Sequence, residues 1–325
     1  MLELLNYRAE NSMKSYKVLI TGGAGYVGSV MTEHFLGKGY SVTVLDDFRY
    51  RQTSLLHLCH QQGLRIVRGD VREPSVLKPL LKDADAIIPL AAVVGAPACD
   101  RHPQEARSIN VGAVKLIDRL RSRSQRVLFP VTNSGYGVGE EGAFCTEESP
   151  LQPISSYGRQ KVEAEKVLMG SGHAIAFRLA TAFGVSPRMR IDLLVNDFTY
   201  RALVDRVIVL FEAHFKRNYI HVRDIARAFA FGLENFARLK GEVFNVGLSS
   251  ANLSKLELCQ TIKRHLPRLV IITSEVGKDP DQRNYIVSNE KIERAGFRAR
   301  HGLDWGIDEL IRAYSFLKHS IHDNL

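Results

Sequence analysis

A tyrosine and a lysine four residues apart could share acid–base chemistry. The segment SSYGRQK at 155–161 begins a predicted helix, so Tyr157 and Lys161 lie on the same face of that helix. The pKa of a free phenol is about 10, and a neighbouring ammonium group would lower it by stabilising the phenolate. Such a tyrosine could take the proton of a secondary alcohol while hydride leaves the alcohol carbon. Because this spacing is frequent by chance on surface helices, its meaning depends on the fold around it.

A hydroxyl lies 25 residues before Tyr157, at the end of a predicted strand. Thr132 closes this strand within the stretch PVTNSGYG at 130–137. Its hydroxyl could hydrogen-bond the same alcohol and orient it toward the tyrosine. In isolation, a threonine that ends a strand is the simpler interpretation, so this role also depends on the fold.

The elements that would position these side chains alternate between strands and helices. This alternation predicts right-handed βαβ units and an α/β fold with a doubly wound parallel sheet. Strand-like runs occupy 17–20, 41–45, 64–67, 86–90, 126–129 and 174–177, with helical patterns such as 29–38 between them. Beyond residue 184 the segments are shorter, with helices expected at 191–203, 222–239, 254–265 and 304–319.

We therefore expect one main domain and a smaller lobe. After an N-terminal extension at 1–16, the sheet domain should span 17–183, with 222–250 returning to it. Residues 184–221 and 251–325 should form a smaller C-terminal α/β lobe that binds the substrate.

A glycine-rich turn between the first strand and the first helix could hold a pyrophosphate. Gly22, Gly25 and Gly28 follow the strand, with Tyr26 and Val27 at the start of the helix. Glycines allow a tight turn and close backbone approach, and the helix N-terminus offers N–H groups to an anion. The pattern predicts a Rossmann-type dinucleotide-binding domain.

Acidic residues at strand ends indicate which dinucleotide would bind. Asp46 ends the second strand and is followed by Asp47. A carboxylate there can accept hydrogen bonds from ribose hydroxyls and would repel a 2′-phosphate, which favours NAD over NADP. Arg49 and Arg51 nearby leave NADP open. Further cofactor contacts are expected where later strands end, from Asp70, Val71, Leu90, Ala91 and Ala92.

Together these residues resemble the extended short-chain dehydrogenase/reductase family of NAD-dependent nucleotide-sugar epimerases, dehydratases and dehydrogenases. The likeness runs from about Lys17 to the C-terminus and includes the segments INVG at 109–112, FRLA at 177–180 and NYIHVRD at 218–224. The family carries Ser or Thr four residues before a Tyr-Gly pair, here Thr132 before Tyr136. The resemblance implies NAD as cofactor, with Asn110, Leu179 and Ala180 also contacting it. It also implies a homodimer formed through the helices that carry 107–121 and 157–169.

Five segments are similar to a narrower group, the bacterial GDP-manno-heptose 4-dehydrogenases. They are AAVVGAPAC at 91–99, NSGYG at 133–137, SPRMRIDLLVND at 186–197, GLSSANL at 247–253 and DPDQR at 279–283. This likeness implies oxidation at C4 of a GDP-linked heptose on the way to surface-polysaccharide sugars.

A nucleoside-diphosphate sugar needs cations for its phosphates and polar groups for its sugar. The candidates for the diphosphate are Arg188, Arg190, Arg217 and Arg283, with Asn196 contributing its amide or its helix-start backbone. The expected substrate-binding residues further comprise Val94, Thr132, Asn133, Ser134 and Thr181.

The two residues after Thr132 bear on the type of reaction. Dehydratases of the family carry an Asp-Glu pair there, whereas this chain has Asn133 and Ser134, which cannot supply the acid and base for loss of water. A C4 dehydrogenase is favoured slightly over a GDP- or UDP-sugar 4-epimerase, because both begin with the same oxidation. A non-catalytic NAD(H)-binding sensor is an alternative of another class, against which the intact Thr132, Tyr157 and Lys161 argue.

Composition bounds the remaining possibilities. The four cysteines at 59, 99, 145 and 259 lack metal-ligand spacing, so no metal site is expected. Arginines crowd 101–126 without a recognition motif, so no nucleic-acid partner is expected, although the net charge of +9 suits a polyanionic small substrate. No apolar run approaches the roughly 20 residues that span a bilayer, and charges interrupt the N-terminus. We therefore expect a cytoplasmic protein with no membrane partner.

Overall fold

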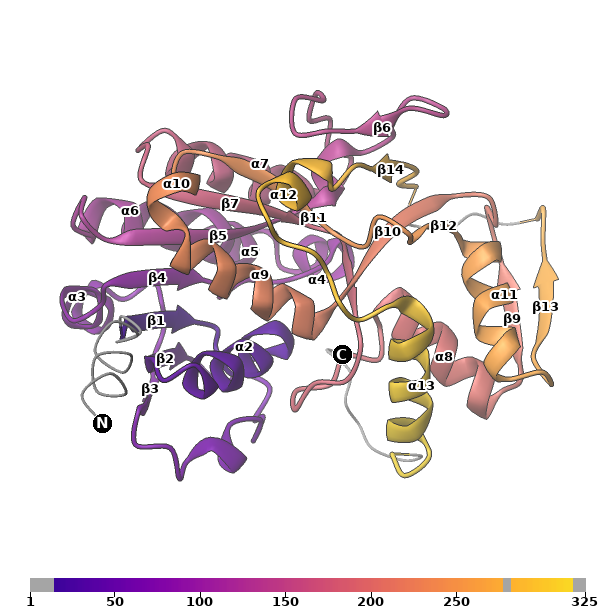
Figure 1. Cartoon of the computed structure of the whole chain (residues 1–325), viewed down its shortest axis with the longest axis horizontal. Coiled ribbons are helices and arrows are strands. Elements are labelled where there is room, and N and C mark those ends of the chain that lie inside the picture. Colours follow the sequence, from indigo (N-terminus) through magenta and orange to yellow (C-terminus); the bar gives the residue numbers. More distant parts are fainter. Residues whose placement is uncertain (1–14, 277–281, 318–325) are drawn as a thin grey trace, which may run out of the picture.

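A seven-stranded, wholly parallel sheet organises the chain (Figure 1). The computed structural model describes residues 15–276 and 282–317. The strand order is β11-β7-β5-β4-β1-β2-β3, so the chain starts near the centre and winds outward in both directions. This order confirms the Rossmann-type fold that the sequence predicts. The strands are β1 (Lys17–Thr21), β2 (Ser41–Asp46), β3 (Leu64–Arg68), β4 (Ala86–Pro89), β5 (Arg126–Thr132), β7 (Ala174–Leu179) and β11 (Val243–Val246).

Helices cover both faces of this sheet because both faces are apolar. Leu128 of β5 packs into one hydrophobic cluster and Phe129 into the other, as the two-residue period of a strand requires. One face carries α2 (Tyr26–Gly37) and α9 (Val222–Glu234). The other carries α3 (Pro74–Lys82), α6 (Val114–Leu120) and α7 (Ser156–Met169). The first cluster continues without a break into the lobe, and this continuity ties the lobe to the sheet domain.

The lobe lies beside the sheet domain, at the right of Figure 1, and is built from short paired strands and three helices. Strand β10 pairs with β8, which directly follows β7, and with β12. Two further pairs are β9 with β13 and β6 with β14. The elements of the lobe are β8 (Thr181–Phe183), β9 (Val207–Leu210), β10 (Lys216–His221), β12 (Asn252–Ser254), β13 (Val270–Thr273), α8 (Leu194–Val204), α11 (Lys255–His265) and α13 (Leu303–Tyr314). The pair of β6 (Phe144–Cys145) and β14 (Ile286–Val287) lies at the top of Figure 1.

Short elements complete the fold. Helix α10 (Phe236–Leu239) is separated from α9 at Asn235, so the helix expected over 222–239 is two helices. Residues 222–250 supply α9 and β11 to the sheet layer. The other short elements are η1 (Leu56–Leu58), α4 (Ala96–Arg101), α5 (Pro103–Arg107), the π-helix η2 (Ser108–Ala113), η3 (Asn133–Tyr136) and α12 (Glu290–Arg294).

The sequence patterns predict the boundaries of helices and strands only approximately. The expected strand 126–129 continues to Thr132, and the helix expected at 191–203 begins only at Leu194. The strands of the lobe escape prediction because each is two to six residues long and is defined by its partner rather than by its own pattern. Residues 1–14 of the expected extension lie outside the described residues.

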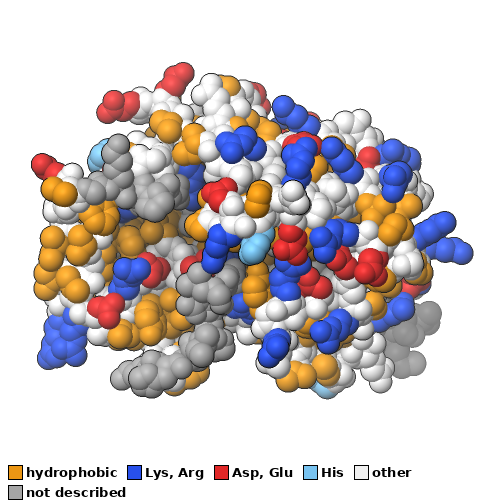
Figure 2. Space-filling view, turned by 180° about the vertical axis from the view of Figure 1, so that it is seen from behind, with side chains coloured by type: hydrophobic (Ala, Val, Ile, Leu, Met, Phe, Trp, Pro, Cys, Tyr) orange, Lys and Arg blue, Asp and Glu red, His pale blue; other side chains and the backbone are white. Residues whose placement is uncertain are grey.

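The surface mixes charges of both signs. On the face shown in Figure 2, Lys and Arg side chains are interspersed with Asp and Glu, while hydrophobic side chains gather over the lobe. Within the described ranges, no helix is long and apolar enough to cross a bilayer. Across those same residues, no group of His, Cys, Asp and Glu could hold a metal ion.

Candidate active site

A cavity of about 1070 Å³ opens at the carboxyl ends of the parallel strands and extends to the lobe. This is the edge at which ligands bind in doubly wound folds. Its walls include most of the residues that the sequence singles out for the cofactor: Gly22, Gly25, Tyr26, Val27, Gly28, Asp46, Asp47, Asp70, Val71, Leu90, Ala91, Ala92, Tyr157, Lys161, Leu179 and Ala180. They also include the substrate candidates Val94, Thr132, Ser134, Thr181, Arg188, Arg190, Arg217 and Arg283.

Asn110 is expected at the cofactor but does not line the cavity. Its side chain is buried and donates to the carbonyl of Val93 at 2.9 Å and to Oε1 of Gln160 at 2.7 Å. Its carbonyl oxygen accepts the N–H of Val93 at 2.8 Å. The amide therefore fastens the loop after β4 to α7, and its influence on a cofactor is indirect.

Two substrate candidates are also buried behind the cavity wall. The Asn196 side chain accepts the N–H of Gly184 at 3.0 Å and donates to the carbonyl of Arg190 at 2.8 Å, so it holds the loop that carries Arg190. Asn133 is 1% exposed, and neither atom of its amide has a hydrogen-bond partner among the described residues. The sequence pattern places these residues near the site but does not show which way their side chains point.

The phosphate loop has no room for side chains at two of its glycines. Gly22 has a φ of +72°, and a Cβ there would lie 2.7 Å from the backbone nitrogen of Ala91. A Cβ on Gly28 would lie 2.3 Å from the carbonyl oxygen of Gly22. The backbone therefore closes tightly around the N-terminus of α2, where a pyrophosphate would meet backbone N–H groups.

Asp46 is held at the end of β2 with its carboxylate on the cavity wall. It accepts the N–H of Ala24 at 3.0 Å and that of Phe48 at 2.9 Å. Burial nevertheless raises the pKa of the Asp46 carboxyl. Nearby Arg49 pairs with Asp47 at 2.7 Å and with Glu105 at 3.4 Å, so its charge is already engaged by acidic groups. This donor and acceptor set fits the ribose hydroxyls of NAD better than a 2′-phosphate.

Replacing Asp46 with alanine should weaken NAD binding about 10- to 100-fold and bring the affinities for NAD and NADP closer together. The measurement is a fluorescence titration of the variant and the parent protein with both reduced cofactors. Because Asp46 also holds Ala24 of the phosphate loop, a purely structural role would weaken both cofactors equally. An unchanged ratio of the two affinities would therefore contradict the role proposed for the carboxylate.

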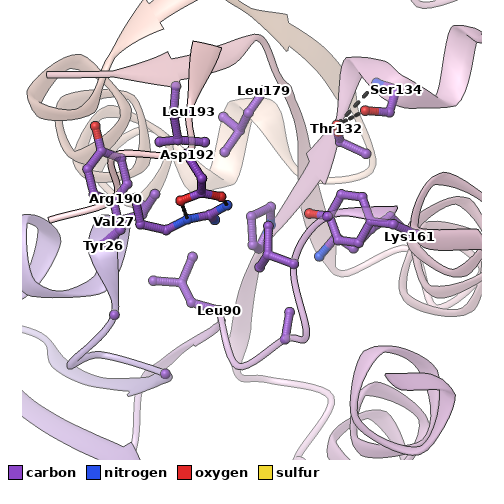
Figure 3. A pocket seen from close by; sticks show the side chains of 18 of the residues that line it. Tyr26, Val27, Leu90, Thr132, Ser134, Lys161, Leu179, Arg190, Asp192 and Leu193 are labelled. Carbon is purple, nitrogen blue, oxygen red and sulfur yellow. Dashed lines mark hydrogen bonds and ion pairs between the residues drawn. The ribbon is translucent and has the colours of Figure 1, made fainter. Parts of the chain in front are cut away.

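The tyrosine and the lysine reach the cavity from the start of α7. The hydroxyl of Ser155 accepts the N–H of Gly158 at 3.0 Å and so caps this helix at its first turn. Tyr157 and Lys161 both line the cavity, and Lys161 is only 4% exposed. Its Nζ lies 4.2 Å from the centroid of the Phe129 ring on β5. In Figure 3, Thr132 and Lys161 approach the cavity from one side and Arg190 and Tyr26 from the other.

Thr132 belongs to a short chain of hydrogen bonds. Its Oγ1 donates to Oγ of Ser134 at 2.9 Å and accepts the Ser134 N–H at 3.1 Å (Figure 3). The Ser134 Oγ also accepts a hydrogen bond from the guanidinium of Arg283. Ser134 therefore holds the Thr132 hydroxyl in place; to orient a substrate alcohol whose proton goes to Tyr157, Thr132 would turn its own proton from Ser134 to the alcohol oxygen.

Burial sets the protonation of the two acid–base groups in the protein without cofactor. It raises the pKa of Tyr157 to about 12 and lowers the pKa of Lys161 to about 7. At Tyr157 desolvation outweighs the nearby charges of Arg190 and Arg283, which lower the pKa. The lowering expected from the Lys161 ammonium together with a positive nicotinamide ring stays a prediction. A phenolate here needs a further positive charge.

The arginines proposed for a diphosphate are distributed along the cavity. Arg190 donates through Nε to Asp192 at 2.9 Å, and the pair lies near the middle of the cavity in Figure 3. Arg188 stacks over the ring of Tyr50, which also lines the cavity, at 5.0 Å. Arg217 and Arg283 lie toward the lobe with Tyr285, whose ring centroid is 5.6 Å from the Arg217 guanidinium carbon.

Several wall residues were not predicted, among them Asp192, Tyr50, Tyr285 and Lys255. Asp192 could have been found as the acidic residue two positions after Arg190, but Tyr50, Tyr285 and Lys255 carry no pattern that separates them from surface residues. Lys255 is the least expected of them, because a lysine in the first turn of a predicted helix is ordinarily solvated.

Comparison with known proteins matches residues 18–247 to the NAD dependent epimerase/dehydratase family. A UDP-glucose 4-epimerase from Corynebacterium glutamicum is 26% identical over 305 residues, covering 86% of this chain and 89% of that protein. A dTDP-glucose 4,6-dehydratase from Streptomyces niveus is 28% identical over 265 residues, covering 76% of each chain. The solved dTDP-glucose 4,6-dehydratase DesIV from Streptomyces venezuelae, with NAD bound, superposes with a TM-score of 0.79 at 25% identity, covering 92% of this chain and 97% of that one.

Proposed function

The chain belongs to the NAD-dependent epimerase/dehydratase family, and from that membership we propose that it oxidises C4 of a nucleotide-diphosphate sugar. As a member of this family it is an NAD-dependent enzyme of the kind that acts on nucleotide sugars. The specific activity that we propose is that of a GDP-heptose 4-dehydrogenase in the synthesis of bacterial surface-polysaccharide sugars. Because members of this family are enzymes, the alternative of a non-catalytic NAD(H)-binding sensor is excluded.

One observation carries the proposal. Thr132, Tyr157 and Lys161 face a single cavity, and the two positions after Thr132 offer it no carboxylate. Asn133 is buried away from the cavity, and the Ser134 hydroxyl is engaged by Thr132 and Arg283. Oxidation of an alcohol therefore has its proton path, whereas loss of water lacks an acid and a base at these positions.

Three residues of the chain would each have a role in the oxidation at C4. The Thr132 hydroxyl orients the C4 hydroxyl, the Tyr157 phenolate oxygen accepts its proton, and the Lys161 ammonium stabilises the phenolate. NAD, when bound, accepts the hydride that leaves C4. Lys161 is nearly buried and lies against the Phe129 ring, so its charge would act strongly on the phenolate. The products are a 4-keto sugar and a protonated tyrosine, which must return its proton to solvent before the next turnover.

A 4-epimerase is the second candidate function. It is favoured by the likeness to the UDP-glucose 4-epimerase of Corynebacterium glutamicum. Epimerisation uses the same first oxidation and then returns hydride to the opposite face of the ketone. The two activities therefore differ in whether the ketone leaves the cavity or turns over within it.

A homodimer through the surface that carries 107–121 and 157–169 remains part of the proposal. On this surface Glu163 of α7 pairs with Arg107 at 2.9 Å and with Lys115 at 2.9 Å. The two helices α6 and α7 lie side by side there, as a helix-pair interface between two copies requires.

Product analysis separates the two functions. We expect incubation of the NAD-loaded protein with GDP-, UDP- and dTDP-sugars to give, for the GDP-linked heptose, a product two hydrogens lighter by mass spectrometry. An unchanged mass with altered stereochemistry at C4 would instead establish the epimerase. A product lighter by one water would contradict the interpretation of Asn133 and Ser134. Equal turnover of all three nucleotide classes would contradict the preference for GDP.

A further inference from the structure

Gln52 lies beside Asp46 on the cavity wall, with only one half of its amide hydrogen-bonded. Its Nε2 donates to Oδ1 of Asp46 at 3.2 Å. Its Oε1 is buried and has no hydrogen-bond partner within the described part of the chain. A buried acceptor without a donor costs folding free energy, so an acceptor in this state on a cavity wall is suited to a ligand that supplies a hydroxyl.

The Asp46 carboxylate has room for only one further donor. Its two oxygens offer about four lone-pair sites, so each oxygen can accept roughly two hydrogen bonds. Oδ1 accepts the N–H of Phe48 at 2.9 Å and an N–H of Gln52 at 3.2 Å. Oδ2 accepts the N–H of Ala24 at 3.0 Å. One site on Oδ2 remains, whereas the adenosine ribose of NAD presents two neighbouring hydroxyls, so recognition of both needs a second acceptor.

The unpartnered amide oxygen of Gln52 lies where this second acceptor is needed. Oε1 and Nε2 are bonded to the same carbon and Nε2 is in contact with Asp46, so Oε1 lies within the width of an amide group of that contact. Two ribose hydroxyls on adjacent carbons are similarly close together. The last side-chain torsion of glutamine is broad, so a small rotation turns Oε1 toward a ligand while the backbone stays in place.

The loop between Asp46 and Gln52 contains two residues in the left-handed region. Phe48 has a φ of 54° and Arg51 a φ of 51°, a conformation that residues other than glycine rarely adopt. The N–H of Arg51 donates to the carbonyl of Phe48 at 2.9 Å, so the loop turns back on itself immediately before Gln52. The side chain of Gln52 is therefore returned to Asp46 by a turn that the folded protein maintains at an energetic cost.

We propose that Gln52 accepts one of the two adenosine-ribose hydroxyls of NAD through Oε1, while Oδ2 of Asp46 accepts the other. The assignment rests on NAD as the cofactor of this family and not on which sugar is oxidised. A 2′-phosphate replaces one hydroxyl donor by acceptors, so NADP would leave one of the two acceptors without a partner. Gln52 is thus a specificity-determining residue for the cofactor, with no part in the chemistry at C4.

Dinucleotide analogues that lack one hydroxyl test this assignment. The protein is titrated by fluorescence with NADH and with its 2′-deoxyadenosine and 3′-deoxyadenosine analogues. In the parent protein each analogue should bind roughly 3- to 10-fold more weakly than NADH, because one hydrogen bond is lost. Gln52→Met should bind NADH roughly 3- to 10-fold more weakly, and for one of the two analogues the penalty relative to NADH should disappear. The other analogue should keep its penalty, because its missing hydroxyl is the partner of Asp46.

Two further variants separate recognition of the hydroxyl from support of Asp46. Gln52→Glu keeps an acceptor at this place but loses the donor to Asp46, so both analogues should keep their penalties. Gln62→Met is the matched control, because Gln62 is near in sequence, is exposed and does not line the cavity. This control should change all three affinities by about two-fold or less.

Four outcomes would overturn the assignment. Penalties that persist for both analogues in Gln52→Met would mean that Gln52 does not contact the ribose. Loss of both penalties together would mean that Gln52 acts only by holding Asp46. Equal binding of NADH and both analogues by the parent protein would mean that neither hydroxyl is recognised. If the parent protein does not bind NADH, the cofactor itself is wrong for this chain, which is distinct from failure of the assignment of Gln52.

Discussion

Replacing Tyr157 with phenylalanine should lower turnover about 100- to 10,000-fold while leaving NAD affinity within about two-fold. Phenylalanine keeps the ring, which packs against the hydrophobic cluster formed by one face of the sheet and its helices. Only the hydroxyl is lost, and with it the acceptor for the proton of the C4 hydroxyl. The measurements are steady-state rates with the best nucleotide sugar from product analysis and a fluorescence titration of the variant with NADH.

Tyr136→Phe is a matched control for this experiment. Its hydroxyl donates to Asn245 at 2.7 Å and accepts from Arg178 at 3.1 Å, but Tyr136 is 2% exposed and does not line the cavity. Losing this hydroxyl should cost about 1 kcal/mol of unfolding free energy and change turnover little. Comparable losses of turnover in both variants would mean that stability, not proton transfer, explains the result for Tyr157. Unchanged turnover in Tyr157→Phe would exclude the tyrosine as the acid–base group.

The pKa values of Tyr157 and Lys161 bear on how NAD would take part in the proton transfer. Without it, burial places the pKa of Tyr157 at about 12, so the phenol is neutral near pH 7. The pKa of Lys161 at about 7 leaves only part of the population charged at that pH. A positive nicotinamide ring beside these residues would favour the phenolate.

The backbone of the site could be predicted from sequence because its signals are local. Gly28 cannot carry a side chain, and Asp46 ends a strand whose pattern is clear, so both follow from a strand, turn and helix of regular length. Thr132 and Tyr157 follow from the same order of elements. Each of these residues lies at a strand end or helix start, where the parallel sheet itself determines the direction of the side chain.

The rest of the site depends on contacts between distant segments. Asn110 and Asn196 stand at expected positions, yet they bond to backbone groups behind the wall because the loops they hold arrive from elsewhere in the chain. Arg190 lines the cavity as expected, but its guanidinium is paired with Asp192, so a ligand diphosphate would compete with that carboxylate. Lys255 reaches the cavity only because α11 packs within the lobe. Sequence patterns specify which face of an element is apolar, but not which polar side chain meets a ligand.

Replacing Lys161 with methionine should lower turnover about 100-fold or more and, at the same time, stabilise the protein without cofactor. Lys161 is 4% exposed and its pKa is lowered from 10.5 to about 7 by burial, with Glu165 opposing that shift. A charged lysine in this place therefore costs folding free energy, and methionine of similar length removes that cost. We expect a higher melting temperature for the variant at pH 7 and loss of the charge that stabilises the phenolate.

The pH dependence of the difference in melting temperature between Lys161→Met and the parent protein tests whether the buried charge causes it. Between pH 7 and about 10.5 the unfolded parent chain still binds the lysine proton that the folded parent chain has released, so the parent is stabilised as pH rises through this range. The advantage of Lys161→Met should therefore be greatest at or below pH 7 and should shrink toward pH 10, as measured by thermal unfolding of both proteins without cofactor. A constant difference across this range would show that packing, not the buried charge, separates the two proteins. A lower melting temperature for the variant at pH 7 would contradict the cost of burying the charge, because Lys161 would then stabilise the folded protein. We expect the opposite, namely that this catalytic lysine lowers the stability of the fold.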